Sequence, residues 1–376
     1  MKLSATNVIT DIKIRACRGG DSLTKLNAAE AIQLSGDSRP DFTVVTITTS
    51  DGIEGTSFGF GALDAQAAAA VMSQVKPFFY GRSPHHTAKN MKDFELFDRR
   101  WNLVPVYAYG PFDNACWDIV GKMANQPVYK LLGAAREKIP LYVSSMFLSD
   151  PAAYVEQALE VQAKGFRGYK LHPPGNLELD IECYRQVRKA VGANFDLMAD
   201  PVISYTYEQA LKAGRVLEKL DYRWLEEPLL DTNMYGLRKL REKLDIPICG
   251  TEVLSGAQYS TAHCIAEGIV DIVRTDVSWR GGITAVMKTA HVAEAFGVQC
   301  ELHTTIYHAL EQVQLHAALS LVNCEFFETL YPFTDFEFGT KSRLNISDGY
   351  VTAPVGEGLC IEYDWDFIDN HTVQVF

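Results

Sequence analysis

The sequence predicts a (β/α)8 (modified TIM) barrel with an α+β capping domain, formed by the N-terminal part of the chain and completed by its C-terminal segment. Three observations lead to this fold class. The chain has 376 residues, which is enough for a large barrel with an added domain. From Ile139 onward, short β-rich runs alternate with amphipathic helical stretches, as in parallel βα units. Ionisable residues end seven of the eight runs, at intervals of 24 to 30 residues.

The N-terminal part is predicted to mix strands and helices. Two runs that alternate polar and apolar residues, 7–16 and 41–50, predict strands, and the Asp-Gly pair at 51–52 is typical of a hairpin turn. A polar stretch between the runs, 18–41, predicts a loop. Apolar residues three and four apart between 63 and 124 predict helices. Together these elements make an α+β unit.

Eight strands are predicted for the barrel, with seven helices between them. The strands have the sequences PLYVSS, FRGYKLH, FDLMAD, YRWLEEP, IPICGTE, IVDIVRTD, VQCELH and EFFETL. Several of the helical stretches end with Gly, which is typical of helix C-termini. After Tyr331 strand-like runs return around an Asp-Gly turn at 348–349, the second run being GLCIEYDWDF, and we expect this tail to pack on the N-terminal unit. The predicted segments are a capping domain over 1–125, a barrel over 126–331 and a C-terminal segment over 332–376.

The composition excludes several classes of function. The net charge is −12, from 35 basic and 47 acidic residues without a long run of like charge, so nucleic acid is not an expected partner. An acidic surface repels anions, so a bound anion needs locally focused positive charge, such as a metal ion. The eight cysteines are far apart and include no C-x-x-C pair, which indicates reduced core residues. No stretch has the pattern of a signal peptide or of a membrane span, so we expect a cytoplasmic location and no membrane partner.

Three carboxylates end consecutive predicted strands: Asp200, Glu226 and Glu252. In a barrel these side chains converge on the C-terminal mouth, about one strand spacing apart. Three carboxylates at close range repel one another unless a cation lies among them. Ligation by oxygen atoms alone suits Mg²⁺. The sequence therefore predicts a Mg²⁺ site formed by these three residues.

Four further residues at the strand ends suit acid/base chemistry. Asp276 and His303 end the next two strands, and a carboxylate beside an imidazole orients the ring and raises its basicity. Lys170 and His172 lie two apart on one strand, so both enter the mouth, opposite His303. Lys170 suits a substrate carboxylate or enolate oxygen. His172 suits a second base, a hydrogen bond to a substrate hydroxyl, or only the start of the Pro-Pro-Gly turn.

Motifs along nearly the whole chain point to a known family. They are PFDNACWDIVGKMANQPVYKLLG, YKLH, LMADP, WLEEP, GTEVLSG, VRTDVSWRGGIT, CELHTT and FETLYP. In these motifs, and in their order and spacing, the chain resembles the enolase superfamily and, within it, the mandelate racemase subgroup. Sites of this superfamily pair a Lys or His base with Mg²⁺ that stabilises an ene-diolate. The resemblance implies the same metal ligands and the same acid/base pair as the strand ends do.

The resemblance also implies roles that the pattern of residues alone does not give. Glu328 is implied to act as a proton-bearing hydrogen-bond donor to the substrate carboxylate oxygen that gains charge. Loops at 18–22 and 57–61 are implied to close over the mouth and select the far end of the substrate. Two positions depart from the subgroup's pattern: His172 stands where many members have a second Lys, and Trp279 stands where relatives are often basic.

The implied activity is removal of the proton beside a carboxylate. The leading hypothesis is a carbon-oxygen lyase, in which protonated His303 helps the β-hydroxyl of a sugar acid leave and a 2-keto-3-deoxy acid forms. The second is a racemase or epimerase, with His172 and His303 acting on opposite faces. A lactone cycloisomerase and a non-catalytic binding homologue are further alternatives. We expect a small carboxylate substrate and a homo-oligomer, while the identity of the acid and its stereochemistry stay open.

Overall fold

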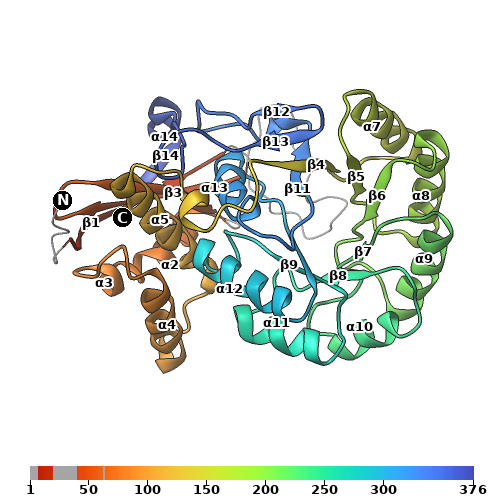
Figure 1. The fold of residues 1–376 in the computed structure, drawn as a ribbon, viewed down its shortest axis with the longest axis horizontal. Helices are drawn as coiled ribbons and strands as arrows, with labels where there is room; N and C mark the ends of the chain where they lie inside the picture. Colours follow the sequence, from red (N-terminus) through yellow and green to blue (C-terminus); the bar gives the residue numbers. More distant parts are fainter. Residues whose placement is uncertain (1–6, 20–39, 62–63) are drawn as a thin grey trace.

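The computed structural model describes residues 7–19, 40–61 and 64–376. A barrel ringed by helices lies beside a smaller domain that contains both ends of the described chain (Figure 1). This is the barrel with an α+β capping domain that the sequence predicts. Most of the predicted loop at 18–41 lies outside the described residues.

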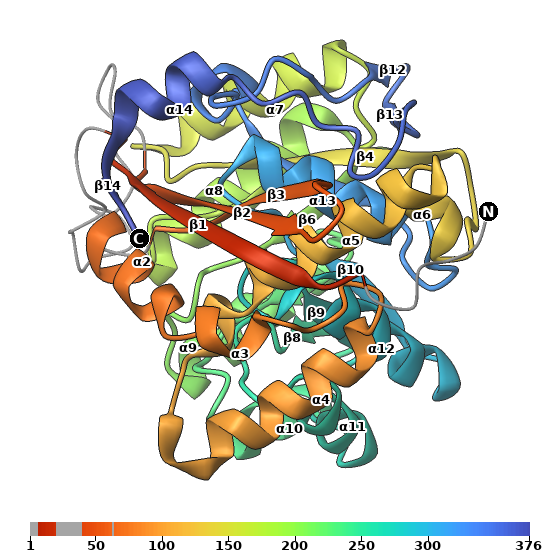
Figure 2. The ribbon, with the colours of Figure 1, turned by 90° about the vertical axis from the view of Figure 1, so that its left-hand side faces the viewer.

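Four antiparallel strands form the sheet of the capping domain, in the order β14-β1-β2-β3. They are β1 (Ile9–Cys17), β2 (Phe42–Thr49), β3 (Glu54–Phe60) and β14 (Thr372–Val375). The predicted hairpin is confirmed, because β2 and β3 pair from Phe42 opposite Phe60 to Thr48 opposite Glu54. The pairing of β14 with β1 confirms that the C-terminal tail packs on the N-terminal unit. Figure 2 shows β1 to β3 in front of the barrel.

The other elements of the described capping domain are helical segments, of which the first and the longest pack on this sheet. They are α2 (Ala65–Ser73), α3 (Lys76–Phe79), α4 (Thr87–Phe97), the turns η1 (Asp98–Asn102) and η2 (Val106–Ala108), α5 (Gly110–Ala124) and α6 (Val128–Leu131). Helix α5 crosses β3 so closely that a Cβ at Gly55 would lie 2.1 Å from the carbonyl oxygen of Ala115. A residue without a side chain is therefore needed at this crossing.

The barrel contains all eight predicted strands. They are β4 (Lys138–Ser145), β5 (Gly168–Leu171), β6 (Asp196–Ala199), β7 (Leu225–Glu226), β8 (Ile248–Gly250), β9 (Ile272–Thr275), β10 (Gln299–Leu302) and β11 (Phe327–Tyr331). Parallel ladders join them in chain order from β4 to β10, and β11 pairs with β4. The helices between them are α7 (Pro151–Ala163), α8 (Leu177–Val191), α9 (Tyr207–Lys219), α10 (Met234–Arg241), α11 (Ala257–Ala266), α12 (Gly282–Ala295) and α13 (His308–Ala318).

A buried carboxylate joins β10 to β11 and so helps to close the barrel. Glu301 accepts hydrogen bonds from the backbone N–H groups of Glu325 (2.8 Å) and Phe326 (3.1 Å), which precede β11. Burial raises the pKa of Glu301 to about 7. Two buried backbone N–H groups thus find their acceptor in a carboxyl group whose charged form is disfavoured by burial.

The C-terminal segment differs from the prediction in one place. Strands β12 (Ile346–Ser347) and β13 (Tyr350–Thr352) form the expected hairpin, and β13 pairs with β4. The run 358–367, however, was expected to be strand-like and makes only isolated bridges before helix α14 (Trp365–His371) begins. The reason is local: Cys360 has a positive φ of 56°, and the Asp364 side chain accepts from the N–H of Phe367 and caps the helix. A 3-10 turn, η3 (Phe333–Asp335), follows β11.

The cysteines agree with the expectation from the sequence. All eight cysteines are free, and seven of them are buried, as predicted for reduced core residues. Among the described helices, none has the length and apolar character needed to cross a membrane.

Candidate active site

The ionisable side chains singled out from the sequence meet at one end of the barrel. They are Lys170, His172, Asp200, Glu226, Glu252, Asp276, His303 and Glu328. Seven lie within two residues of the end of a strand, whereas Glu328 is the second residue of β11 and lies deeper. Close side-chain contacts join them in two groups, one around Lys170 and the other around His303. Carboxylates of the two groups lie within 4.8 Å of one another, so the predicted convergence is confirmed.

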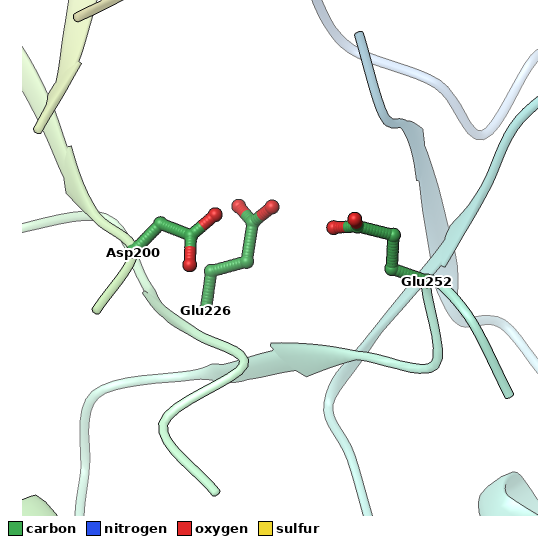
Figure 3. A group of neighbouring side chains, drawn as sticks. All are labelled: Asp200, Glu226 and Glu252. Atoms are coloured by element: carbon green, nitrogen blue, oxygen red, sulfur yellow. The ribbon is translucent and has the colours of Figure 1, made fainter. Parts of the chain in front are cut away.

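Asp200, Glu226 and Glu252 form an acidic triad. One carboxylate oxygen from each lies within 4.8 Å of the others. Figure 3 shows the carboxylates of Asp200 and Glu226 side by side, with Glu252 facing them from another strand end. Burial and the nearby charge of Asp200 raise the pKa of Glu252 well above its usual range. Three carboxylate oxygens with too little positive charge around them suit a hard divalent cation such as Mg²⁺.

The backbone beside the triad is strained. Four non-glycine residues have positive φ angles: Val202 (46°), Ile203 (56°), Glu227 (36°) and Thr251 (80°). Positive φ is rare for non-glycine residues and a clear outlier for β-branched ones. Such residues gather at functional sites, where the surrounding structure holds them in place. The strained loops after β6, β7 and β8 therefore indicate a functional site at this end of the barrel.

Two buried cations lie beneath the triad. Lys170 Nζ lies 2.8 Å from both Glu226 and Glu328, and 3.3 Å from Asp200. Arg274 Nη2 lies 2.8 Å from Glu226 and 2.5 Å from Glu328. All of these side chains are fully or almost fully buried. Arg274 is not among the site residues predicted from the sequence, although its position on β9, two residues before Asp276, places both side chains on the same face of the strand.

The expectation that Glu328 carries a proton is wrong. Although burial favours the neutral acid, the charges of Lys170 and Arg274 hold the pKa of Glu328 well below its usual range. Its carboxylate also accepts from the hydroxyl of Ser144 and from the N–H of Thr304 (3.0 Å). Glu328 is therefore an ionised acceptor, and the donors at this point of the site are Lys170 and Arg274.

His303 and Asp276 form the predicted pair. Asp276 Oδ1 accepts from the N–H (2.6 Å) and hydroxyl (2.6 Å) of Ser278 and from the N–H of Trp279 (2.7 Å). Its Oδ2 lies 3.8 Å from His303 Nδ1, which is too far for a hydrogen bond, and neither atom has a hydrogen-bond partner in the described part of the chain. The other ring nitrogen, Nε2, lies 3.2 Å from Glu252. Burial lowers the pKa of His303 well below its usual value, so the ring is neutral and can accept a proton.

His172 enters the same space from the other side of the mouth. Its Nδ1 lies 2.6 Å from the carbonyl oxygen of Ser145, and its Nε2 lies 3.2 Å from Asp200. Both ring nitrogens thus face oxygen acceptors. His172 and His303 line one cavity, so the geometry allows a base on each face of a bound substrate. The catalytic roles of both histidines stay predictions.

The cavity above the triad has a volume of about 310 Å³. Its lining residues are Met146, Phe147, His172, Asp200, Val202, Ile203, Glu227, Glu252, Val253, Trp279, His303, Thr304, Ile306 and Leu330. Trp279 stacks on His303, with ring centroids 4.8 Å apart, and the ring of Phe60 meets Trp279 edge-on at 5.6 Å. Residues 57–60 of the predicted capping loop are in fact the end of strand β3, whose last residue, Phe60, packs against Trp279 beside the mouth. Of the other predicted loop, residues 20–22 lie outside the described residues.

Comparisons with known proteins agree with this geometry. Residues 153–367 match the family model described as "Enolase C-terminal domain-like", and residues 24–133 match "Mandelate racemase / muconate lactonizing enzyme, N-terminal domain". The chain is 29% identical to arabinonate dehydratase of Saccharolobus solfataricus, over 83% of this chain and 86% of the relative. It is 27% identical to N-succinyl-L-Arg/Lys racemase of Bacillus cereus, over 74% and 76%. The solved structure of D-glucarate dehydratase from Agrobacterium tumefaciens complexed with magnesium is 31% identical, with 98% and 99% coverage and a TM-score of 0.86.

Proposed function

Since the chain belongs to the mandelate racemase and muconate lactonizing enzyme family of the enolase superfamily, we propose that it removes the proton α to the carboxylate of a small substrate with the help of Mg²⁺. The observation that carries this proposal is the position of the buried His303 ring, with Nδ1 3.8 Å from Asp276 and Nε2 3.2 Å from Glu252 of the acidic triad. A base in this position accepts a proton without first losing one. The family's enzymes include lyases and isomerases, so the outcome after proton removal needs its own argument.

Each group of residues in the site has a separate proposed role. Asp200, Glu226 and Glu252 would hold Mg²⁺, which supplies positive charge for the substrate carboxylate as it gains electrons. His303 accepts the α-proton at Nε2, and Asp276 stabilises the resulting imidazolium through Nδ1. The ammonium of Lys170 adds positive charge below the reacting carbon.

We propose dehydration of a 2,3-dihydroxycarboxylate, the class of acids that includes the sugar acids, as the overall reaction. The proton from the α-carbon moves to His303, which returns a proton to the β-hydroxyl as the carbon-oxygen bond breaks. Water leaves, and the enol tautomerises to a 2-keto-3-deoxy acid. Two of the relatives described above are dehydratases of acids of this class, which supports this outcome.

A racemase or epimerase is the second candidate, and the placement of His172 favours it. His172 and His303 line the same cavity from different strand ends. One ring could remove the α-proton and the other could return a proton to the opposite face.

One experiment separates these outcomes. The Mg²⁺-loaded protein is incubated in D2O with a library of sugar acids and α-substituted carboxylates, and products are followed by proton NMR and a carbonyl-trapping reagent. A trapped 2-keto acid supports dehydration. Deuterium at the α-carbon with inverted configuration and an intact hydroxyl supports the isomerase. Absence of both α-proton exchange and keto acid across the library would refute proton abstraction altogether.

A further inference from the structure

The wall of the active-site cavity is apolar away from the reacting groups. Of the fourteen lining residues in the described part of the chain, eight have apolar side chains, and they come from several strand ends. Five of the six polar ones belong to the cluster of histidines and carboxylates around the triad. The sixth, Thr304, uses its hydroxyl to donate to Glu311 (2.8 Å) and its N–H to donate to Glu328 (3.0 Å). Within the described wall, the far end of a substrate thus meets hydrocarbon and aromatic surface.

The apolar wall begins directly beside the proposed base. Trp279 covers one face of the His303 ring, and Phe60 from the capping domain packs edge-on against Trp279. Phe60 in turn contacts Tyr307, with ring centroids 6.3 Å apart. The capping domain therefore packs an aromatic ring against Trp279, which itself lines the cavity.

Backbone strain gives an independent observation. Val202 and Ile203 both line the cavity, and both are β-branched residues at positive φ, 46° and 56°. Gly, Asn or Asp adopts this conformation at lower energy. The side chain of Ile203 is also 43% exposed, and that of Val253 on the facing loop is 55% exposed. Strained and exposed apolar side chains around one cavity indicate contact with an apolar ligand group.

We propose that the group beyond the β-carbon of the substrate is apolar. For dehydration the substrate is then a 2,3-dihydroxycarboxylate, R–CHOH–CHOH–COO⁻, in which R is an alkyl or aryl group and not a polyol chain. The α-proton and the β-hydroxyl leave as water, and the product is R–CH2–CO–COO⁻. The inference rests on the proposed function for the reacting end, and it concerns only the distal end.

The test compares ligands that differ only at the distal end. The 2,3-dihydroxyhexanoates and the hexonates are matched in length and in C2 and C3 configuration, and all diastereomers are measured with the Mg²⁺-loaded protein. Binding is measured by calorimetry and turnover by keto-acid formation. A buried hydroxyl that loses water without gaining a partner weakens binding by about tenfold. We therefore expect the alkyl acids to bind at least about tenfold more tightly, and equal or tighter binding of the polyols overturns the inference.

Binding and turnover are read separately, so the two proposals fail separately. Tight binding of the alkyl acids without α-proton exchange would refute the proposed function and support the inference on the apolar group. Turnover of the polyols in preference to the alkyl acids would support the proposed function and refute the inference on the apolar group.

A substitution at the wall sharpens the comparison. Ile203→Asn places a hydrogen-bonding side chain at the rim and relieves an unfavourable φ, so the fold should keep its stability. We expect the preference for the alkyl acid to fall about tenfold, and Val253→Asn to act in the same direction. Val322→Asn, at a 64% exposed position outside the cavity, is the matched control and should leave the preference unchanged. If Ile203→Asn and Val253→Asn also leave it unchanged, the wall does not select the distal group.

Discussion

Replacing Arg274 by Met should destabilise the protein strongly, because this side chain neutralises two buried carboxylates. Its Nη2 lies 2.8 Å from Glu226 and 2.5 Å from Glu328, and all three side chains are fully buried. Removal of one partner from a buried ion pair leaves an uncompensated charge and costs about 3–5 kcal/mol. Lys170 contacts the same two carboxylates, but its single charge cannot neutralise both. We expect a loss of unfolding free energy in this range.

A matched control exists in the same chain. Arg223 also bridges two carboxylates, Asp196 at 3.2 Å and Glu325 at 2.6 Å, but its side chain is 33% exposed. Solvent screens such pairs, so Arg223→Met should cost only about 0–1 kcal/mol. Both variants are compared by chemical denaturation in EDTA, so that no divalent cation contributes to the difference.

A second substitution tests whether charge is the cause. Glu328→Gln removes one of the two anions that Arg274→Met leaves unpaired, so the double variant should recover part of the lost stability. A coupling of about 0.5–3 kcal/mol is typical for residues in one network. The reasoning is refuted if Arg274→Met costs no more than Arg223→Met, or if the double variant is no more stable than Arg274→Met alone.

Three further predictions concern the site and the barrel. His303→Asn should lower the rate of α-proton exchange about 10²–10⁴-fold, measured by NMR in D2O, whereas His308→Asn, which removes a buried histidine beside Glu311, should keep most of the activity; equal losses would contradict the role of His303. Glu252→Gln should abolish the rise in melting temperature that Mg²⁺ gives the wild type, because a ligand that binds only the folded state stabilises it; an undiminished rise would exclude Glu252 as a ligand. Because Glu301 has a pKa of about 7 when folded and 4.5 ordinarily, the folded state holds its proton more tightly, and unfolding free energy should fall by up to about 3 kcal/mol as pH rises from 4.5 to 7. Glu301→Gln should flatten this part of the pH profile, and an unchanged slope would contradict the assignment.

The fold and the acidic triad could be predicted from the sequence because both depend on short-range patterns. Alternating βα runs specify parallel strands, and a residue at the end of each run lies at the mouth whatever the details of packing. The helix α14 was missed because its signal is a single capping residue, Asp364, within a run that otherwise alternates. There a local hydrogen bond decides the structure against the apparent period.

The charge states inside the site could not be predicted in the same way. Glu328 was expected to carry a proton, and this expectation failed because Arg274 had not been recognised as a neighbour. Side chains two residues apart on a strand point to the same face, as predicted for Lys170 and His172. The same rule places Arg274 on the face of Asp276, and Glu301 on the face of His303. Arg274 and Glu328 lie on two strands, β9 and β11, that are not consecutive along the chain. No pattern in the sequence reveals that their side chains are in contact.

The balance of charge around the triad favours a divalent cation over a monovalent one. Lys170 and Arg274 supply two buried positive charges. Three carboxylates, Asp200, Glu226 and Glu328, form ion pairs with them, and a fourth, Glu252, lies beside the first two in the triad. Ionisation of all four leaves two negative charges, and burial raises the pKa values of Glu226 and Glu252. A cation of charge two at the triad restores neutrality, and it concentrates positive charge where a carboxylate substrate must approach an otherwise acidic protein.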